Sequence, residues 1–141
     1  MKVVIASDHA GYSYKQEIKN FLKSKSIQVI DVGTNSIESC DYPIFARAAA
    51  EKVADGSADY GVLVCSSGEG IAIAANKVKG VRAGIGYNDD VARLMRQHNN
   101  ANMIAFGATF MKLPDVLKRI EIFLTTPFEG GRHERRVNEI E

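Results

Sequence analysis

The run Tyr60-Gly61-Val62-Leu63-Val64-Cys65, followed directly by Ser66-Ser67-Gly68-Glu69-Gly70, indicates the fold of this chain. The first half is a continuous apolar segment, the pattern of a strand buried on both faces of a parallel sheet. The second half is a polar loop with two glycines, which lets the backbone approach a ligand closely. A strand, such a loop and a helix in succession predict a ligand site at the carboxyl edge of an open sheet.

The same alternation extends in both directions. Further apolar runs, expected to be strands, cover residues 3–6, 27–32, 81–86 and 102–107. Amphipathic runs, expected to be helices, cover residues 14–22, 42–55, 70–78, 88–97 and 113–124. Ser13 and Gln16 have the spacing of a capping box for the first helix, and Asp41 is a suitable N-cap for the second. The order predicts an α/β, three-layer Rossmann-like fold, with a five-stranded parallel sheet, helices on both faces and a C-terminal tail.

Composition limits the function classes. The chain has 141 residues, 45% hydrophobic and 25% charged, with 18 Lys+Arg against 17 Asp+Glu. One domain over 1–141 fits this length, with 128–141 as a charged tail. The net charge of +1 argues against a dedicated nucleic-acid binder, and no run is long enough for a membrane span. Cys40 and Cys65 fit neither a metal-binding spacing nor a Cys-x-x-Cys redox pair, so we expect a reduced, cytoplasmic chain.

The loop after Tyr60–Cys65 is the first candidate binding site. Backbone N–H groups at its end, next to a helix N-terminus, would stabilise an anion. The loop has neither the spacing of a P-loop nor that of a dinucleotide-binding fingerprint. Cys65 opens it, and two interpretations stand: a buried small apolar residue, or a thiolate suited to nucleophilic attack or proton abstraction beside a carbonyl. Cys40 lacks such a setting and is read as structural.

Three other groups of polar residues are candidates for ligand binding or catalysis. Asp8 and His9 follow the first strand, where they either cap a helix and face solvent or bind a polyhydroxy or phosphorylated ligand. His98 ends the helix predicted over 88–97, which runs about 15 Å away from the Cys65 edge. His98 is therefore either a helix C-terminal histidine or part of another subunit's site. The arginines of the tail pose the same choice, between a frayed end and a phosphate ligand of a neighbouring chain.

With these residues the chain resembles the type B ribose-5-phosphate isomerases, in the family that also contains galactose-6-phosphate isomerase subunits. The resemblance covers essentially the whole chain and rests on six blocks in order: 7–11, 31–34, 41–43, 65–71 with 74–77, 96–102, and 130–133 with 136–137.

The resemblance implies a metal-free, cofactor-free aldose–ketose isomerase of carbohydrate metabolism, placed in the pentose phosphate pathway. It would interconvert ribose 5-phosphate and ribulose 5-phosphate through a cis-enediolate. By position, Cys65 matches the base and His98 the residue that assists ring opening. The positions that match substrate contacts are Asp8, His9, the loop Ser66, Ser67, Gly68, Glu69 and Gly70, then Asn99, Arg132 and Arg136. The family's site forms between subunits, so a homodimer or tetramer is expected, without nucleic-acid or membrane partners.

Three positions depart from the family pattern. Relatives that lack the cysteine use a glutamate where this chain has Ile71, so Cys65 stays the candidate base. Glu69 lies in the loop, one step short of a glycine-flanked glutamate base, and is read as a loop residue whose backbone matters more. Thr109 stands where some relatives have a phosphate-binding arginine. The expected phosphate ligands are therefore Arg132 and Arg136, and Arg135 or Thr109 is the candidate to replace the missing arginine.

Two alternatives remain at this point. The first is the same chemistry on allose 6-phosphate or galactose 6-phosphate, since one more carbon needs little room. The second is a non-enzymatic flavodoxin-like or receiver module. Receivers need an Asp after the third strand and a Lys after the fifth, where this chain has Cys65 and Gly107.

Overall fold

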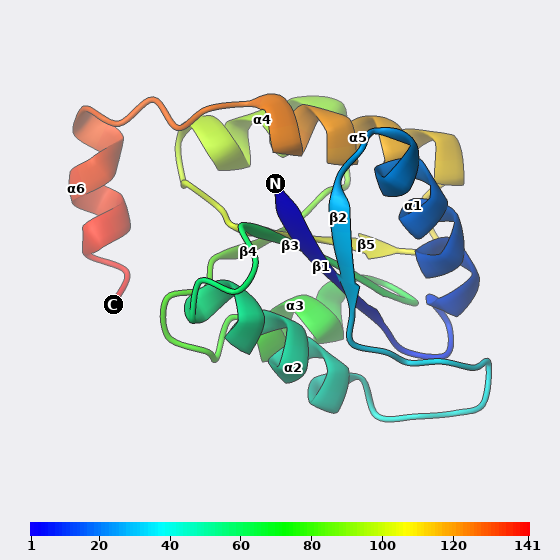
Figure 1. Cartoon of the computed structure of the whole chain (residues 1–141). Coiled ribbons are helices and arrows are strands. Elements are labelled where there is room, and N and C mark those ends of the chain that lie inside the picture. The colour runs from blue at the N-terminus through cyan, green and yellow to red at the C-terminus, as the bar shows by residue number, and fades with distance from the viewer.

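Strands and helices alternate along the computed structural model, which describes residues 1–141 (Figure 1). The strands are β1 (Lys2–Ser7), β2 (Gln28–Asp31), β3 (Tyr60–Cys65), β4 (Ala83–Ile85) and β5 (Met103–Gly107). The helices are α1 (Tyr12–Ser24), α2 (Tyr42–Ala54), α3 (Glu69–Ala75), α4 (Asp89–Gln97), α5 (Leu113–Thr125) and α6 (Arg132–Asn138).

All five strands are parallel, in the order β2-β1-β3-β5-β4. Ser7 pairs with Val64, and Cys65 pairs with Gly107, so the ends of β1, β3 and β5 lie level at the carboxyl edge. The chain goes outward from β1 to β2 and then returns to β3 on the other side of β1. This reversal between β1 and β3 is the switch point at which open α/β sheets bind ligands.

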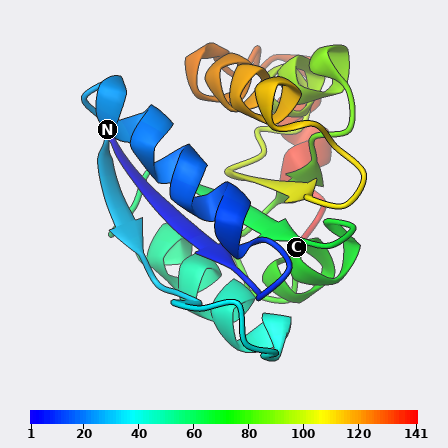
Figure 2. The same ribbon diagram turned by 90° about the vertical axis from the view of Figure 1, so that its right-hand side faces the viewer.

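Helices cover both faces of the sheet, with α1, α4 and α5 on one face and α2 and α3 on the other (Figures 1 and 2). Successive strand residues face opposite layers: Val62 and Val64 join the first core, whereas Leu63 and Cys65 join the second. All four are buried, which is why the strand sequence is continuously apolar. Each fully buried Val or Leu contributes about 1.5–3 kcal/mol of transfer free energy. The fold predicted from the sequence is therefore confirmed.

The region between α3 and β4 is less regular than expected. The helix predicted over 70–78 ends at Ala75, and the strand predicted over 81–86 shortens to Ala83–Ile85. Asn76 accounts for both differences, because its side-chain amide donates to the Ala83 carbonyl (2.9 Å) and accepts from the Ala83 N–H (2.8 Å). This pair of bonds ends the helix and fixes where β4 begins.

The start of α1 also differs from expectation. The predicted capping box at Ser13 is wrong: Gly11 is the N-cap, with no side-chain hydrogen bond to the helix. The Asp8 carboxylate accepts from the Gly11 N–H at 3.1 Å instead. A Cβ on Gly11 would lie 2.5 Å from the Val64 carbonyl oxygen, so only glycine lets α1 start this close to β3.

The C-terminal tail stands apart from the layers. In Figure 1, α6 lies beyond the sheet at the end of an extended connection, and none of its residues is buried. Pro127 follows α5 after one residue, in agreement with its predicted role as the end of that helix. None of the helices has the length and apolarity needed to cross a lipid bilayer.

Candidate functional site

Cys65 is the last residue of β3 and lies under the following loop, with its side chain 5% exposed. The backbone N–H of Gly68 donates to Cys65 Sγ over 3.2 Å. Gly68 has φ +84°, and a Cβ there would lie 3.0 Å from the carbonyl carbon of Phe106. Glycine is thus required at this turn, which aims an N–H donor at the sulfur.

The loop after Cys65 presents further donors. The N–H groups of Ser66, Ser67 and Gly70 donate to no acceptor in the chain, while the Glu69 N–H donates to Ser67 Oγ (3.1 Å). Three such unpaired N–H groups in one short loop beside Cys65 can donate to a negatively charged oxygen.

The neighbouring strand β5 holds this loop in place. Ser66 Oγ and Thr109 Oγ1 are 2.7 Å apart, and the Thr109 N–H donates to the Ser66 carbonyl at 3.0 Å. A Cβ on Gly107 would lie 2.5 Å from the carbonyl of Ser67, so β5 and the loop are in direct backbone contact. Thr109 therefore supports the loop through its hydroxyl.

Asp8 and His9 lie at the same edge, beside the end of β3. The Asp8 N–H donates to the Val64 carbonyl at 3.2 Å, one residue before Cys65. His9 Nδ1 accepts the Cys40 N–H at 3.2 Å. Neutral His9 therefore carries its proton on Nε2, which leaves that nitrogen as a donor to a ligand.

A buried ion pair supports the β1 and β2 ends of this site. Lys15 is fully buried, with Nζ 2.6 Å from Asp31 Oδ1; Lys19 Nζ lies 2.7 Å from Asp31 Oδ2. Asp31 Oδ1 also accepts the Gly33 N–H (2.9 Å). Burial raises the pKa of Asp31, but the hydrogen bonds from Lys15, Lys19 and Gly33 outweigh it and hold the pKa below its usual value.

Tyr42 borders this loop, although the sequence gives it only a place at a helix start and in the block 41–43. A Cβ on Gly70 would lie 2.7 Å from Tyr42 Cζ and 3.0 Å from its hydroxyl. Tyr42 is 39% exposed, so it is accessible to solvent beside the loop. The sequence signal for this contact is Gly70 at the start of the predicted helix, because a glycine allows another group to approach the backbone closely.

A second polar cluster joins the end of α4 to the tail. The rings of His98 and His133 stack with centroids 4.2 Å apart and an interplanar angle of 11°. Glu129 Oε1 lies 3.8 Å from His98 Nε2 and 3.6 Å from His133 Nε2. Burial, then the charges of His98, Arg132 and Arg136, lower the pKa of His133, while Glu129 partly opposes them. Glu129 was not singled out from the sequence, and His133 was noted only as part of the basic tail.

Arg132 and Arg136 lie on the exposed surface of α6, in the same segment as this cluster. The contact of Arg136 is an N–H donated to the Arg132 carbonyl at 3.4 Å, so neither guanidinium is paired with a carboxylate. Asn99 directly follows His98 in the chain. Its carbonyl accepts from Arg82 Nε at 3.1 Å.

The two clusters lie at opposite edges of the sheet. The segment after His98 pairs with the beginning of β3, where the Gly61 N–H donates to the Asn102 carbonyl. Cys65 ends the same strand four residues later, about 13 Å away along its axis. The structure thus brings together Cys65, residues 66–70, Asp8 and His9, and separately His98, Asn99, Arg132 and Arg136.

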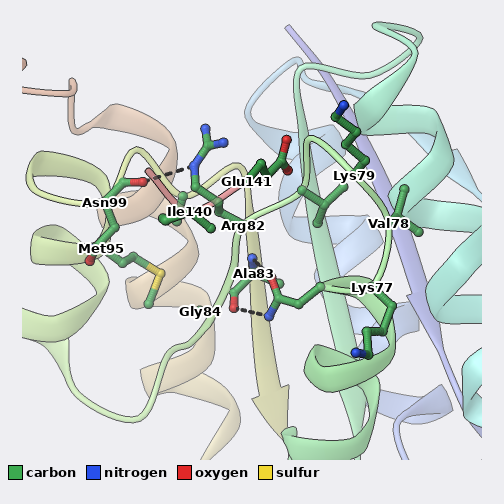
Figure 3. A pocket seen from close by; sticks show the side chains of 13 residues that line it. Lys77, Val78, Lys79, Arg82, Ala83, Gly84, Met95, Asn99, Ile140 and Glu141 are labelled. Carbon is green, nitrogen blue, oxygen red and sulfur yellow. Dashed lines mark hydrogen bonds between the residues drawn. The ribbon is translucent and has the colours of Figure 1, made fainter. Parts of the chain in front are cut away.

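The largest cavity belongs to neither the Cys65 loop nor its neighbours. It has a volume of about 500 Å³ and lies beside the edge strand β4, between Met95, Arg82 and the C-terminal Ile140 (Figure 3). Asn99 lines it, together with Lys77 and Lys79 on the opposite side. None of the three cavities in the chain is lined by Cys65.

Comparison with known proteins shows to which family this chain belongs. The sequence model of the Ribose/Galactose Isomerase family matches residues 3–140. The chain belongs to this family. Among curated members, ribose-5-phosphate isomerase B of Escherichia coli is 42% identical over 139 residues, covering 99% of this chain and 93% of that protein. The probable ribose-5-phosphate isomerase B of Mycoplasma genitalium is 43% identical over 140 residues, covering 98% and 92%.

Solved members of the ribose/galactose isomerase family have the same fold. Ribose-5-phosphate isomerase B of Clostridium thermocellum superimposes with a TM-score of 0.98 at 46% identity, covering 99% of this chain and 95% of that one. The Mycoplasma genitalium enzyme, solved with bound ribulose-5-phosphate, has a TM-score of 0.95 at 42% identity, with 99% and 93% covered. The resemblance drawn from the six sequence blocks is confirmed.

Proposed function

We propose that this chain is an aldose–ketose isomerase that interconverts ribose 5-phosphate and ribulose 5-phosphate. The observation that carries this proposal is the sulfur of Cys65 under a loop with three unpaired N–H groups, in a member of the ribose/galactose isomerase family. Two relatives with over 40% identity and nearly full coverage are called ribose-5-phosphate isomerase B, one of them with a ribulose-5-phosphate complex.

Cys65 acts as the base in this scheme. Its thiolate takes the proton from carbon 2 of the open-chain aldose, and the electron pair of that bond forms the carbon–carbon double bond of a cis-enediolate. Sulfur then returns the proton to carbon 1, while a second proton moves from the carbon 2 oxygen to the carbon 1 oxygen. The reaction only moves protons, so no redox cofactor or metal ion enters the scheme.

The loop of residues 66–70 stabilises the intermediate. Negative charge develops on the two enediolate oxygens, and the N–H groups of Ser66, Ser67 and Gly70 are free to donate to them. One preorganised donor of this kind contributes about 3–4 kcal/mol to the stability of an oxyanion transition state. Asp8 and the Nε2–H of His9 bind hydroxyl groups further along the sugar.

The remaining groups come from a second copy of the chain. His98 assists opening of the sugar ring, Asn99 contacts the substrate, and Arg132 and Arg136 bind the phosphate by charge-assisted hydrogen bonds. Support comes from the separation of the two clusters and from α6, which has no buried residue in its own chain. A homodimer, or a tetramer built from such dimers, completes two sites by seating each tail beside the partner's Cys65 loop.

The scheme also requires a reduced sulfur, which favours the cytoplasm as the compartment. Thiols such as Cys65 and Cys40, both free here, stay reduced there.

An isomerase assay across sugar phosphates tests the activity directly. Ribose 5-phosphate should be converted to ribulose 5-phosphate by the purified chain in the presence of EDTA. Turnover of allose 6-phosphate or galactose 6-phosphate alone would replace the substrate assignment while leaving the proton-transfer scheme in place. No turnover of any of these sugars would overturn the proposed function.

A further inference from the structure

We propose that His98, Glu129 and His133 form a binding site for a divalent transition-metal ion, zinc above all, that switches the isomerase off. One ring nitrogen of each histidine and one carboxylate oxygen of Glu129 lie within 4.8 Å of one another. The inhibitory part of this proposal rests on the proposed function, because it uses His98 as the ring-opening residue. The binding part stands on the geometry alone.

The three side chains are held together by backbone contacts as well as by their own stacking. The Glu129 N–H donates to the Gln97 carbonyl at 3.1 Å, which fixes Glu129 beside the end of α4 and next to His98. Arg96, buried under the same turn, donates to the carbonyls of Ala101 and Thr126 and thereby joins α4 to the end of α5. The His133 N–H donates to the Gly130 carbonyl at 3.1 Å, in the turn that leads into α6. The donor groups therefore meet without any large rearrangement of the chain.

The distances suit a zinc ion once the two histidine rings turn out of their parallel stack, so that both nitrogen lone pairs point at the ion. Zinc binds histidine nitrogen and carboxylate oxygen at about 2.0–2.2 Å, which places neighbouring ligand atoms of a tetrahedron about 3.4 Å apart. Glu129 Oε1 is already 3.6 Å from His133 Nε2 and 3.8 Å from His98 Nε2. The side chain of Glu129 is 50% exposed and that of His98 is 38% exposed, so both are free to close the remaining gap.

The donor set selects the ion. Two imidazoles and one carboxylate, with a water in the fourth position, are a common ligand set for zinc. Imidazole favours Zn²⁺, Cu²⁺ and Ni²⁺ over Mg²⁺ and Ca²⁺, which prefer oxygen ligands. Arg132 and Arg136 lie on the same helix as His133 and repel a cation, which limits the affinity. We therefore expect reversible binding that responds to the concentration of free zinc.

Occupation of the site removes His98 from catalysis. A metal ion on the ring nitrogen takes the lone pair that proton transfer to the sugar requires. Zinc binding therefore inhibits the isomerase, and EDTA restores activity, although the reaction itself uses no metal.

Zinc titration of the full-length, metal-free protein tests the site, with a chromophoric chelator as competitor and Co²⁺ as a spectroscopic probe. The wild type should bind one Zn²⁺ per chain. Glu129→Gln and His133→Asn should each weaken binding by about tenfold or more. Their unfolding midpoints should stay close to that of the wild type, because neither residue belongs to the hydrophobic core. Cys40→Ser is the matched control, since Cys40 and His9 are the nearest competing pair of ligands, and it should bind zinc as the wild type does.

The outcomes separate the two parts of the proposal. The Co²⁺ complex should show ligand-field bands without a sulfur-to-metal charge-transfer band, and the zinc concentration for half inhibition should rise in Glu129→Gln in step with the affinity. Unchanged zinc affinity in both variants, a thiolate band that Cys40→Ser abolishes, or no zinc binding would overturn the site. Binding as expected with undiminished turnover would overturn the inhibition. If no sugar phosphate is turned over at all, the proposed function fails while the binding result still decides the site.

Discussion

Cys65 and His98 lie at opposite edges of one parallel sheet. Cys65 ends β3 at the carboxyl edge, whereas His98 caps the C-terminus of α4, which runs back toward the edge where the strands begin. Each residue has its own neighbours of matching chemistry: a donor loop beside Cys65, and an imidazole, a carboxylate and two arginines near His98. One chain thus contains two separate polar clusters, which we propose to be the two halves of a site shared between subunits.

Replacing Cys65 by alanine should abolish isomerisation without unfolding the chain. The substitution removes only the sulfur from a well-packed position, so we expect a loss of about 1 kcal/mol in the free energy of unfolding. Loss of a general base costs about 10²–10⁴-fold in kcat. Steady-state kinetics and thermal unfolding check both. Cys40→Ala is the control, because His9 is bound by the backbone N–H of Cys40, which alanine keeps. Full turnover in Cys65→Ala would return the cysteine to a purely structural role.

Two glycines with the same left-handed backbone distinguish an effect on the loop from an effect on stability. Gly68 has φ +84° and Gly56 has φ +83°, but a Cβ on Gly56 meets nothing within 4 Å. Alanine at either position should cost about 1–2 kcal/mol of stability for the left-handed backbone. Only Gly68→Ala also pushes against β5 and displaces the donor loop, which should lower kcat about 100-fold. Equal kcat values in the two variants would contradict a role for this loop in the reaction.

The Asp31 ion pair should make stability depend on acid pH. The pKa of Asp31 is lowered from 3.8 in the folded chain, so the folded state favours the carboxylate more than the unfolded state does. Its contribution is complete above pH 3.8 and is lost as the pH falls through the lower, folded pKa. Asp31→Asn leaves Lys15 buried without its partner, and we expect a loss of about 3 kcal/mol at neutral pH.

Urea unfolding of the wild type and Asp31→Asn at several pH values measures this contribution. The gap between the two proteins should be constant near neutral pH and should shrink as the pH falls below 3.8. Asp90→Asn serves as the comparison, since Asp90 makes only an exposed pair with Arg93 on one turn of α4. A gap that widens toward acid pH would contradict the sign of the shift.

The fold was predictable because its signals are local. Strands buried on both faces must be apolar at every position, and β3 was predicted to the residue from that pattern. The failures have a common cause in contacts between distant segments. Asn76 ends α3 early by bonding to Ala83, and Gly11 starts α1 because β3 leaves no room for a side chain. Neither contact leaves a periodic trace in the sequence.

The site was predictable in part. The Cys65 loop and the Asp8-His9 pair follow from the rule that ligands bind at the carboxyl edge, and the structure places them together. The separation of His98 also followed from helix length alone. The place of Tyr42 beside the Cys65 loop and the contacts of Glu129 with His98 and His133 did not, because each depends on segments that are far apart in the sequence. The pairing of the two halves concerns a second chain and is a proposal.

Mixing two inactive variants tests the shared site most directly. Cys65→Ala and His98→Ala chains should each be inactive alone. After subunit exchange in equal amounts, half of the dimers contain one chain of each kind, and one of the two sites in such a dimer has both an intact Cys65 and an intact partner His98. The account predicts recovery of about one quarter of the wild-type specific activity. No recovery, with exchange demonstrated by mass labels on the two chains, would contradict it.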